Sequence, residues 1–198
     1  EFSTVFLAAF SARWAVRKNI DRDMFLWYYS DIFMIRLTPY KQRPNFCGPA
    51  ALQVVFAYYG ISVSEKKLAE LCHTIGKGAT REEEGTLHKD LVAAARSAGF
   101  SVESKTGGTI EELKKYIAKK IPIIVGWYAF ADDHYSIVYN VTDDYIHMVD
   151  TESHLKEHKR HMRIGRFKEL WFDYDNREKP EEKTLGWFLA ITPARGLR

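Results

Sequence analysis

The order of helix-type and strand-type segments is the feature that most constrains this fold. Between residues 47 and 120, apolar residues recur at the spacing of amphipathic helices. From residue 121 onward, short runs rich in β-branched and aromatic residues alternate with turns instead. Helices that come first and strands that come afterwards are typical of α+β proteins rather than of wound parallel sheets. We therefore predict an α+β fold in which N-terminal helices pack on an antiparallel sheet.

Local signals mark where the helices begin and end. We predict helices over residues 47–59, 64–72, 86–97 and 109–120. Gly60 follows the first helix as a C-terminal stop, and Ser64 is an N-cap for the second. Thr109 and Glu112 have the spacing of a capping box at the start of the fourth. These signals divide the first half of the chain into separate helices.

The second half of the chain is predicted to be mainly sheet. We predict strands over residues 100–104, 121–130, 134–142, 145–150 and 186–192, with a short helix over residues 163–172. The turns at 131–133 and 143–144 are short, which favours antiparallel neighbours. The middle strands therefore form an antiparallel meander.

The 198 residues are enough for one ordinary domain with a sizeable core. We assign this domain to residues 40–193, with an N-terminal extension at 1–39 and a C-terminal tail at 194–198. Three interpretations of the extension stay open: an amphipathic helix packed on the body, an interfacial segment, or sequence that is not native to the protein.

Composition excludes several function classes. The 29 basic and 26 acidic residues nearly balance, and the basic ones are scattered, which argues against a nucleic-acid partner. No apolar run reaches the roughly 18 to 20 residues of a transmembrane helix. The two cysteines are too few for a secreted disulfide scaffold and lack metal-type spacing. We therefore predict a cytoplasmic protein without a cofactor, and the sequence leaves the oligomeric state open.

One cysteine has the setting of a nucleophile. Cys47 directly precedes Gly48 and Pro49 at the start of the first helix. The unpaired amide groups at a helix start favour negative charge, which stabilises a thiolate there. Pro49 suits the first turn, and the small Gly48 is expected to leave access to the sulfur. Cys72, in contrast, is expected to pack in the core.

The partners that a nucleophilic thiol needs are present downstream. A thiol requires a base, and the base requires an acceptor that fixes its tautomer. His134 begins one predicted strand and Asp150 ends the next, so the short turn between these strands allows the two side chains to approach each other. Gln42 could donate its side-chain amide to the oxyanion of a tetrahedral intermediate, together with the backbone N–H of Cys47.

The segments "QRPNFCGPAALQVVFAYYG", "EGTLHKDLVAAARSAGFSV", "DHYSIVYNV" and "YIHMVDTE" together resemble the bacteriocin-processing, double-glycine-leader family of papain-like cysteine peptidases. The resemblance runs from about Tyr40 to Thr192 and implies a papain-like fold and a peptide or protein substrate. It also implies four roles: Cys47 as nucleophile, His134 as general base and acid, Asp150 as orienting carboxylate and Gln42 as oxyanion donor. We interpret the chain as a stand-alone domain without the transporter found in the fused members.

The sequence departs from the family pattern in three ways. Gln42 lies one residue closer to the cysteine than in many members, Asn45 and Phe46 replace a frequent acidic residue, and Thr151 stands where proline is common. Two other functions stay open beside a peptidase. One is a catalytically silent module that binds a peptide or protein in the same cleft. The other is an acyltransferase that forms the same thioester.

The remaining histidines and two aromatic residues are interpreted more simply. On a helix, the spacing of His154, His158 and His161 would place the three side chains on one face, where they could bind a metal. We favour the simpler interpretation that this polar segment is a solvated loop or a sheet edge. The residues interpreted as surface or capping residues are His73, His88 and His147. Trp127 and Tyr128 precede the turn to His134 and either line the cleft or pack in the core.

Overall fold

The computed structural model describes residues 35–76, 84–129, 131–152, 158–175, 178–179 and 181–194. Residues 1–34 and 195–198 lie outside the described residues. The predicted divisions at residues 39 and 193 therefore stay predictions. Ile35 and Leu37, from the end of the predicted extension, contact the hydrophobic core.

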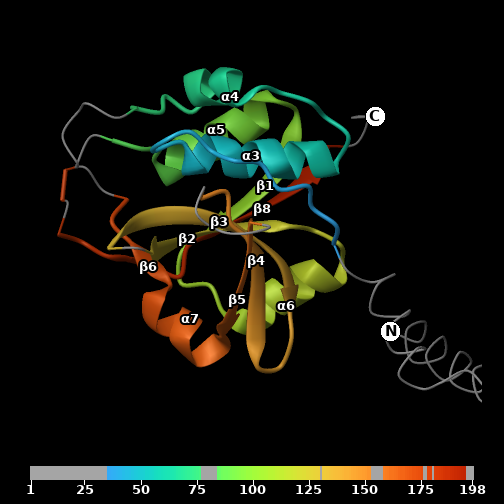
Figure 1. Cartoon of the computed structure of the whole chain (residues 1–198), viewed down its shortest axis with the longest axis vertical. Coiled ribbons are helices and arrows are strands. Elements are labelled where there is room, and N and C mark those ends of the chain that lie inside the picture. Colours follow the sequence, from blue (N-terminus) through green and yellow to red (C-terminus); the bar gives the residue numbers. More distant parts are fainter. Residues whose placement is uncertain are drawn as a thin grey trace, which may run out of the picture. The chain divides into compact units, whose positions relative to one another are not determined.

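Five helices and two sheets make up the described part of the chain (Figure 1). The helices are α3 (Cys47–Tyr58), α4 (Glu65–Leu71), α5 (His88–Ser97), α6 (Ile110–Ala118) and α7 (Ile164–Leu170). The strands of the main sheet are β1 (Phe100–Lys105), β2 (Ile123–Ala129), β3 (Asp132–Val141), β4 (Tyr145–Val149), β5 (Lys159–Arg163) and β8 (Phe188–Pro193). A small second sheet contains β6 (Phe172–Asp173) and β7 (Thr184–Leu185). This arrangement confirms the predicted α+β class.

The main sheet is antiparallel throughout, in the order β1-β8-β2-β3-β4-β5. The predicted meander is confirmed in β2, β3 and β4, and β5 extends it. The last strand, β8, lies between β1 and β2 and pairs with both. The register of β2 and β3 places Trp127 opposite His134 and Gly126 opposite Tyr135.

Helices cover both faces of the main sheet. Helices α3, α4 and α5 lie on one side, whereas α6 and α7 lie on the other (Figure 1). The apolar residues of α3 are almost all buried, which explains why the whole segment reads as hydrophobic. Phe56 of α3 stacks on Phe100 of β1, with ring centroids 4.3 Å apart. The core therefore joins the first helix to the edge of the sheet that is farthest from β5.

The predicted capping signals are confirmed at two helices. The Ser64 side chain accepts from the backbone N–H of Lys67 at the start of α4. Thr109 and Glu112 form a reciprocal capping box at the start of α6. Gly60, which follows the C-cap residue Tyr59 of α3, has a φ of +78°, a conformation that glycine adopts without steric cost.

Strand β5 was not among the predicted strands, although a sheet edge was one of the two interpretations of its histidine-containing segment. Its five residues, Lys159–Arg163, are polar or charged apart from one methionine, and they lack the apolar alternation of a half-buried strand. Because β5 is the edge strand of the sheet, its outer side chains remain in water and need no apolar character. The pairing of β5 with β4 sets the position of Arg160, which contacts the candidate site.

Candidate active site

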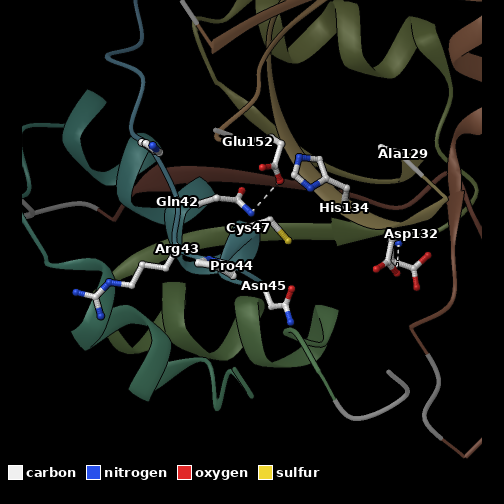
Figure 2. Close-up of a pocket in the computed structure, with 11 residues that line it drawn as sticks. Gln42, Arg43, Pro44, Asn45, Cys47, Ala129, Asp132, His134 and Glu152 are labelled. Carbon is white, nitrogen blue, oxygen red and sulfur yellow. Dashed lines mark hydrogen bonds between the residues drawn. The ribbon is translucent and has the colours of Figure 1, made fainter. Parts of the chain in front are cut away.

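A cleft of about 490 Å³ opens beside the N-terminal end of α3. Its lining comes from the segment before α3, the turn between β2 and β3, and the segment after β4 (Figure 2). The lining residues are Lys41, Gln42, Arg43, Pro44, Asn45, Cys47, Ala129, Asp132, Asp133, His134 and Glu152. Three of the four residues predicted for catalysis therefore border one cleft.

Cys47 is the first residue of α3, as predicted, and its side chain is partly exposed at the cleft. In Figure 2, its sulfur lies beside the ring of His134. The Cys47 side chain interacts with the His134 ring closely enough to raise the pKa of the imidazole. The structure therefore brings together two side chains that are 87 positions apart in the sequence.

Asp150 holds the other side of the His134 ring. The Nε2 atom of His134 donates to Asp150 Oδ1 over 2.8 Å. The same carboxylate oxygen accepts from the backbone N–H of Glu152 at 3.1 Å, and Oδ2 accepts from Arg160 Nε at 3.0 Å. Because Nε2 is engaged by Asp150, Nδ1 is the ring nitrogen left for the thiol. Asp150 is fully buried, so these donors replace the water that it lacks.

The contacts shift the pKa values of both buried groups. Burial by itself lowers the pKa of His134, but the hydrogen bonds with Asp150 and Cys47 and their negative charge raise it to about 10. Burial raises the pKa of Asp150, but the hydrogen bonds from His134 and Glu152 and the charge of Arg160 lower it to about 2. An imidazolium held by the Asp150 carboxylate is therefore the favoured state of this pair.

Stability is expected to peak in mildly acidic solution. The pKa of Asp150 falls from 3.8 on folding, so its contribution is present above pH 3.8 and is lost as the pH falls toward 2. The pKa of His134 rises from 6.5, so its contribution is present below pH 6.5 and is lost as the pH rises toward 10. Denaturant unfolding across this range measures both limbs. The slope from one proton is at most about 1.4 kcal/mol per pH unit. An alkaline limb that is unchanged in His134→Ala would contradict this assignment.

Gln42 lies on the same side of the cleft as Glu152 (Figure 2). Its backbone N–H donates to the carbonyl oxygen of Thr151 at 3.0 Å. The Thr151 hydroxyl donates to Gln42 Oε1 at 2.7 Å, and Gln42 Nε2 donates to Glu152 Oε2 at 3.5 Å. The shift of Gln42 by one position relative to the family pattern therefore does not remove its side chain from the cleft.

The structure corrects the role predicted for Gly48 and adds a conformational role for Asn45, both close to Cys47. A Cβ atom on Gly48 would lie 3.0 Å from Thr86 and 3.2 Å from Leu91, so this glycine allows close packing of α3 rather than access to the sulfur. Asn45 has a φ of +65°, a left-handed conformation that asparagine tolerates better than most residues. The turn that leads into α3 requires this conformation at position 45, which is why asparagine is suitable there.

Arg160 contacts Asp150, and Trp127 contacts His134. The sequence did not identify Arg160 as part of the site. Its guanidinium contacts Asp150 and lies 5.4 Å from the centroid of the Trp127 ring. Trp127 is buried, donates from Nε1 to Ser136 Oγ at 3.0 Å, and meets the His134 ring edge to face. Of the two interpretations of Trp127, core packing is therefore correct. A signal for Arg160 was absent because its strand was not predicted.

A second group of buried ionisable residues surrounds His88. This residue is buried, which corrects its interpretation as a surface residue, although it does begin α5. Its Nε2 lies 2.8 Å from Asp173 Oδ2 and its Nδ1 lies 3.3 Å from Asp175 Oδ2. Its backbone N–H donates to Asp175, and its ring stacks on Trp187 at 3.7 Å. Burial raises the pKa of Asp175. These contacts join α5 to the segment around β6.

The remaining predictions for cysteine and histidine have separate outcomes. Cys72 is fully buried, as expected. His161 lies in β5 and His158 just before it, whereas His154 is outside the described residues. Within the described ranges, no three His, Cys, Asp or Glu side chains are arranged to hold a metal ion. No helix in the described part of the chain has both the length and the apolar character needed to cross a bilayer.

Comparison with models of known protein families shows to which family the chain belongs. The model of the peptidase C39 family matches residues 38–174, more than two thirds of the chain. The chain belongs to the peptidase C39 family. The matched segment contains all four residues predicted for catalysis, together with Thr151 and Arg160.

Individual relatives agree with this assignment. The C39 domain is similar to the peptidase domain of Streptococcus ComA, a bi-functional ABC transporter of a quorum-sensing pathway. That similarity has a TM-score of 0.59 at 25% identity and covers 81% of this chain and 99% of that domain. A double glycine motif protease from an AMS/PCAT transporter, solved with a leader peptide, has a TM-score of 0.58 at 20% identity and covers 81% and 94%. The papain-like part of the fold prediction is confirmed.

A sequence relative gives no further functional information. An uncharacterized protein of Methanothermobacter marburgensis is 32% identical over 105 residues, which are 52% of this chain and 63% of that protein. The matched part therefore spans less than two thirds of the relative. The catalytic roles of Cys47, His134, Asp150 and Gln42 stay predictions, as do the cytoplasmic location and the absence of a nucleic-acid partner.

Proposed function

We propose that this C39 domain is a cysteine peptidase that cleaves a peptide bond through an acyl-thioester on Cys47. The Cys47 sulfur attacks the substrate carbonyl carbon, a C–S bond forms, and the carbonyl π electrons move onto oxygen. The intermediate collapses when the C–N bond breaks, and His134 donates a proton to the leaving amine. Water, deprotonated by His134, then releases the acyl group and restores the thiol.

The observation that carries the proposal is the continuous chain of contacts from Cys47 through His134 to Asp150. Asp150 fixes the ring so that its other nitrogen faces the thiol, and it stabilises the imidazolium that the reaction requires. The raised pKa of His134 supports a proton that is already on the ring when the sulfur attacks. A module that only bound peptides would gain nothing from a buried imidazolium aligned on a thiol.

Gln42 and the backbone N–H of Cys47 are the proposed donors to the oxyanion. The first amide groups of a helix lack partners within the helix. The backbone N–H of Cys47, at the start of α3, can therefore point at the developing charge. The proposed substrate is a peptide or protein, as in the related protease solved with a leader peptide. The open position of the cleft beside α3 supports a substrate that binds from the surface.

The test combines thiol labelling with turnover. At neutral pH, iodoacetamide is expected to modify Cys47 in the parent protein and to leave Cys72 unmodified, because Cys72 is buried and burial raises its pKa to about 12. The modified site is identified by mass spectrometry. The parent is expected to cleave members of a mixture of fluorescence-quenched peptides, and Cys47→Ala is expected to be inactive. Turnover that survives Cys47→Ala would overturn the proposal.

The same assay separates the other two functions. A silent module would bind peptides saturably, with unchanged affinity in Cys47→Ser and no turnover in the parent. An acyltransferase would transfer the acyl group to an added amine in preference to water, so product analysis with and without the amine distinguishes it from a hydrolase.

A further inference from the structure

The proposed oxyanion donor needs a fixed orientation as well as a suitable position. A glutamine amide has an oxygen at one end and an NH₂ group at the other, and only the NH₂ end stabilises an oxyanion. Rotation about the last side-chain bond exchanges the two ends, and this rotation is soft. A group that holds the Gln42 oxygen away from the reacting carbonyl would therefore determine whether the donor is available.

Thr151 makes the contact that holds this oxygen. Its hydroxyl donates to Gln42 Oε1 at 2.7 Å, and its backbone carbonyl accepts from the Gln42 N–H at 3.0 Å. Thr151 is fully buried, so water does not compete for its hydroxyl. One residue thus fixes both the backbone and the side chain of Gln42.

Glu152 selects the same orientation from the opposite end of the amide. Its carboxylate lies 3.5 Å from Gln42 Nε2, and a carboxylate attracts the NH₂ group but repels the amide oxygen. The amide nitrogen carries two hydrogens, so one is left for a ligand in the cleft. Thr151 and Glu152 therefore both oppose a flipped amide.

The segment that holds Gln42 also holds the histidine. The Asp150 carboxylate accepts a hydrogen bond from His134 Nε2, and it also accepts one from the backbone N–H of Glu152. Three consecutive residues, Asp150, Thr151 and Glu152, are thus bonded to both sides of the cleft. A proline at position 151, common in the family, could not supply the hydroxyl, so this contact follows from the sequence of this chain.

We propose that Thr151 is a positioning residue that orients the Gln42 amide for oxyanion stabilisation. This inference rests on the proposed cysteine peptidase function. Thr151 does not touch the reacting atoms, and it acts only through Gln42. Loss of an oxyanion donor costs about 10²–10³-fold in rate, so a misoriented donor is expected to cost about tenfold.

The test uses acylation by p-nitrophenyl acetate, which depends on the thiol and the oxyanion donors but not on peptide specificity. Sulfur attacks the acetyl carbon, an oxyanion forms, and the C–O bond breaks to release nitrophenolate. Thr151→Val, which keeps the side-chain shape without the hydroxyl, is expected to lower the acylation rate constant about tenfold. Thr151→Ser is expected to stay within about twofold of the parent, since it keeps the hydroxyl.

Two further measurements separate positioning from a general structural effect. Alkylation of Cys47 by iodoacetamide forms no oxyanion, so its rate is expected to be equal in Thr151→Val and the parent. In a double-mutant cycle, Thr151→Val is expected to have no further effect on acylation when Gln42 is already alanine. Acylation by Thr151→Val at the parent rate, or additive effects in the cycle, would overturn the inference alone. If the parent releases no nitrophenolate in a Cys47-dependent way, the proposed function fails as well.

Discussion

Replacement of His134 by alanine is expected to lower peptide turnover by about 10⁴-fold, the loss typical of a missing member of a catalytic triad. In the proposed mechanism, the variant loses both the general base and the cation that stabilises the attacking sulfur. Alkylation of Cys47 is expected to slow for the same reason. Initial rates with the cleaved peptides and alkylation rates measured by mass spectrometry test both effects.

The variant is expected to remain folded because Asp150 keeps two of its donors. Arg160 Nε and the backbone N–H of Glu152 still satisfy the buried carboxylate when the imidazole is absent. The matched control is His73→Ala, since His73 is exposed and only approaches Asp90 at 3.4 Å. Free imidazole is expected to restore part of the turnover of His134→Ala by entering the vacated space. A variant that keeps a tenth or more of the parent rate would exclude His134 as the base.

Replacement of Gly126 by alanine is expected to have the largest effect on stability. A Cβ atom at this position of β2 would lie 2.0 Å from Asp173 Oδ2 and 2.8 Å from His88 Nε2. The methyl group would force apart a buried histidine and carboxylate that lie 2.8 Å from each other. Overpacking of a core costs about 1–3 kcal/mol and disruption of a buried ion pair about 3–5 kcal/mol. The free energy of unfolding is therefore expected to fall by at least about 3 kcal/mol.

Gly165→Ala is the matched control for this change. Gly165 lies in α7, and a Cβ atom there would meet nothing within 4 Å. The same substitution is expected to be neutral or to stabilise the protein by up to about 1 kcal/mol, because alanine has the higher helix propensity. Urea unfolding of both variants beside the parent measures the difference. Equal stability of Gly126→Ala and Gly165→Ala would show that the contact between His88 and Asp173 is not as close as described.

The elements that the sequence predicted correctly carry strong local signals. The long apolar segment that ends at Gly60 and the capping box of Thr109 and Glu112 define α3 and α6 without reference to the rest of the chain. The short turns around Asp132 and Asp143 predicted the meander, because they leave adjacent strands no alternative but to pair as neighbours. The predicted approach of His134 to Asp150 follows from this meander.

The features that the sequence missed depend on contacts between distant segments. Arg160 reaches Asp150 only because β5 pairs with β4, and the composition of β5 does not distinguish a sheet edge from a solvated loop. His88 is buried because Asp173 and Asp175 supply charged partners from a segment 85 or more positions away. A hydroxyl at position 151 has meaning only once Gln42 lies against it. Periodicity reports which face of an element is apolar, but it does not report which polar groups meet.

The central position of β8 has a consequence for synthesis of the protein. Residues 188–193 occupy the place between β1 and β2, although both of these strands are made more than 50 residues earlier. Until β8 has left the ribosome, β1 lacks its partner and β2 has one open edge. Unpaired edges invite association with other chains. The nascent chain should therefore complete the main sheet only after residues 188–193 have been made, and premature termination before residue 188 should yield an aggregating product.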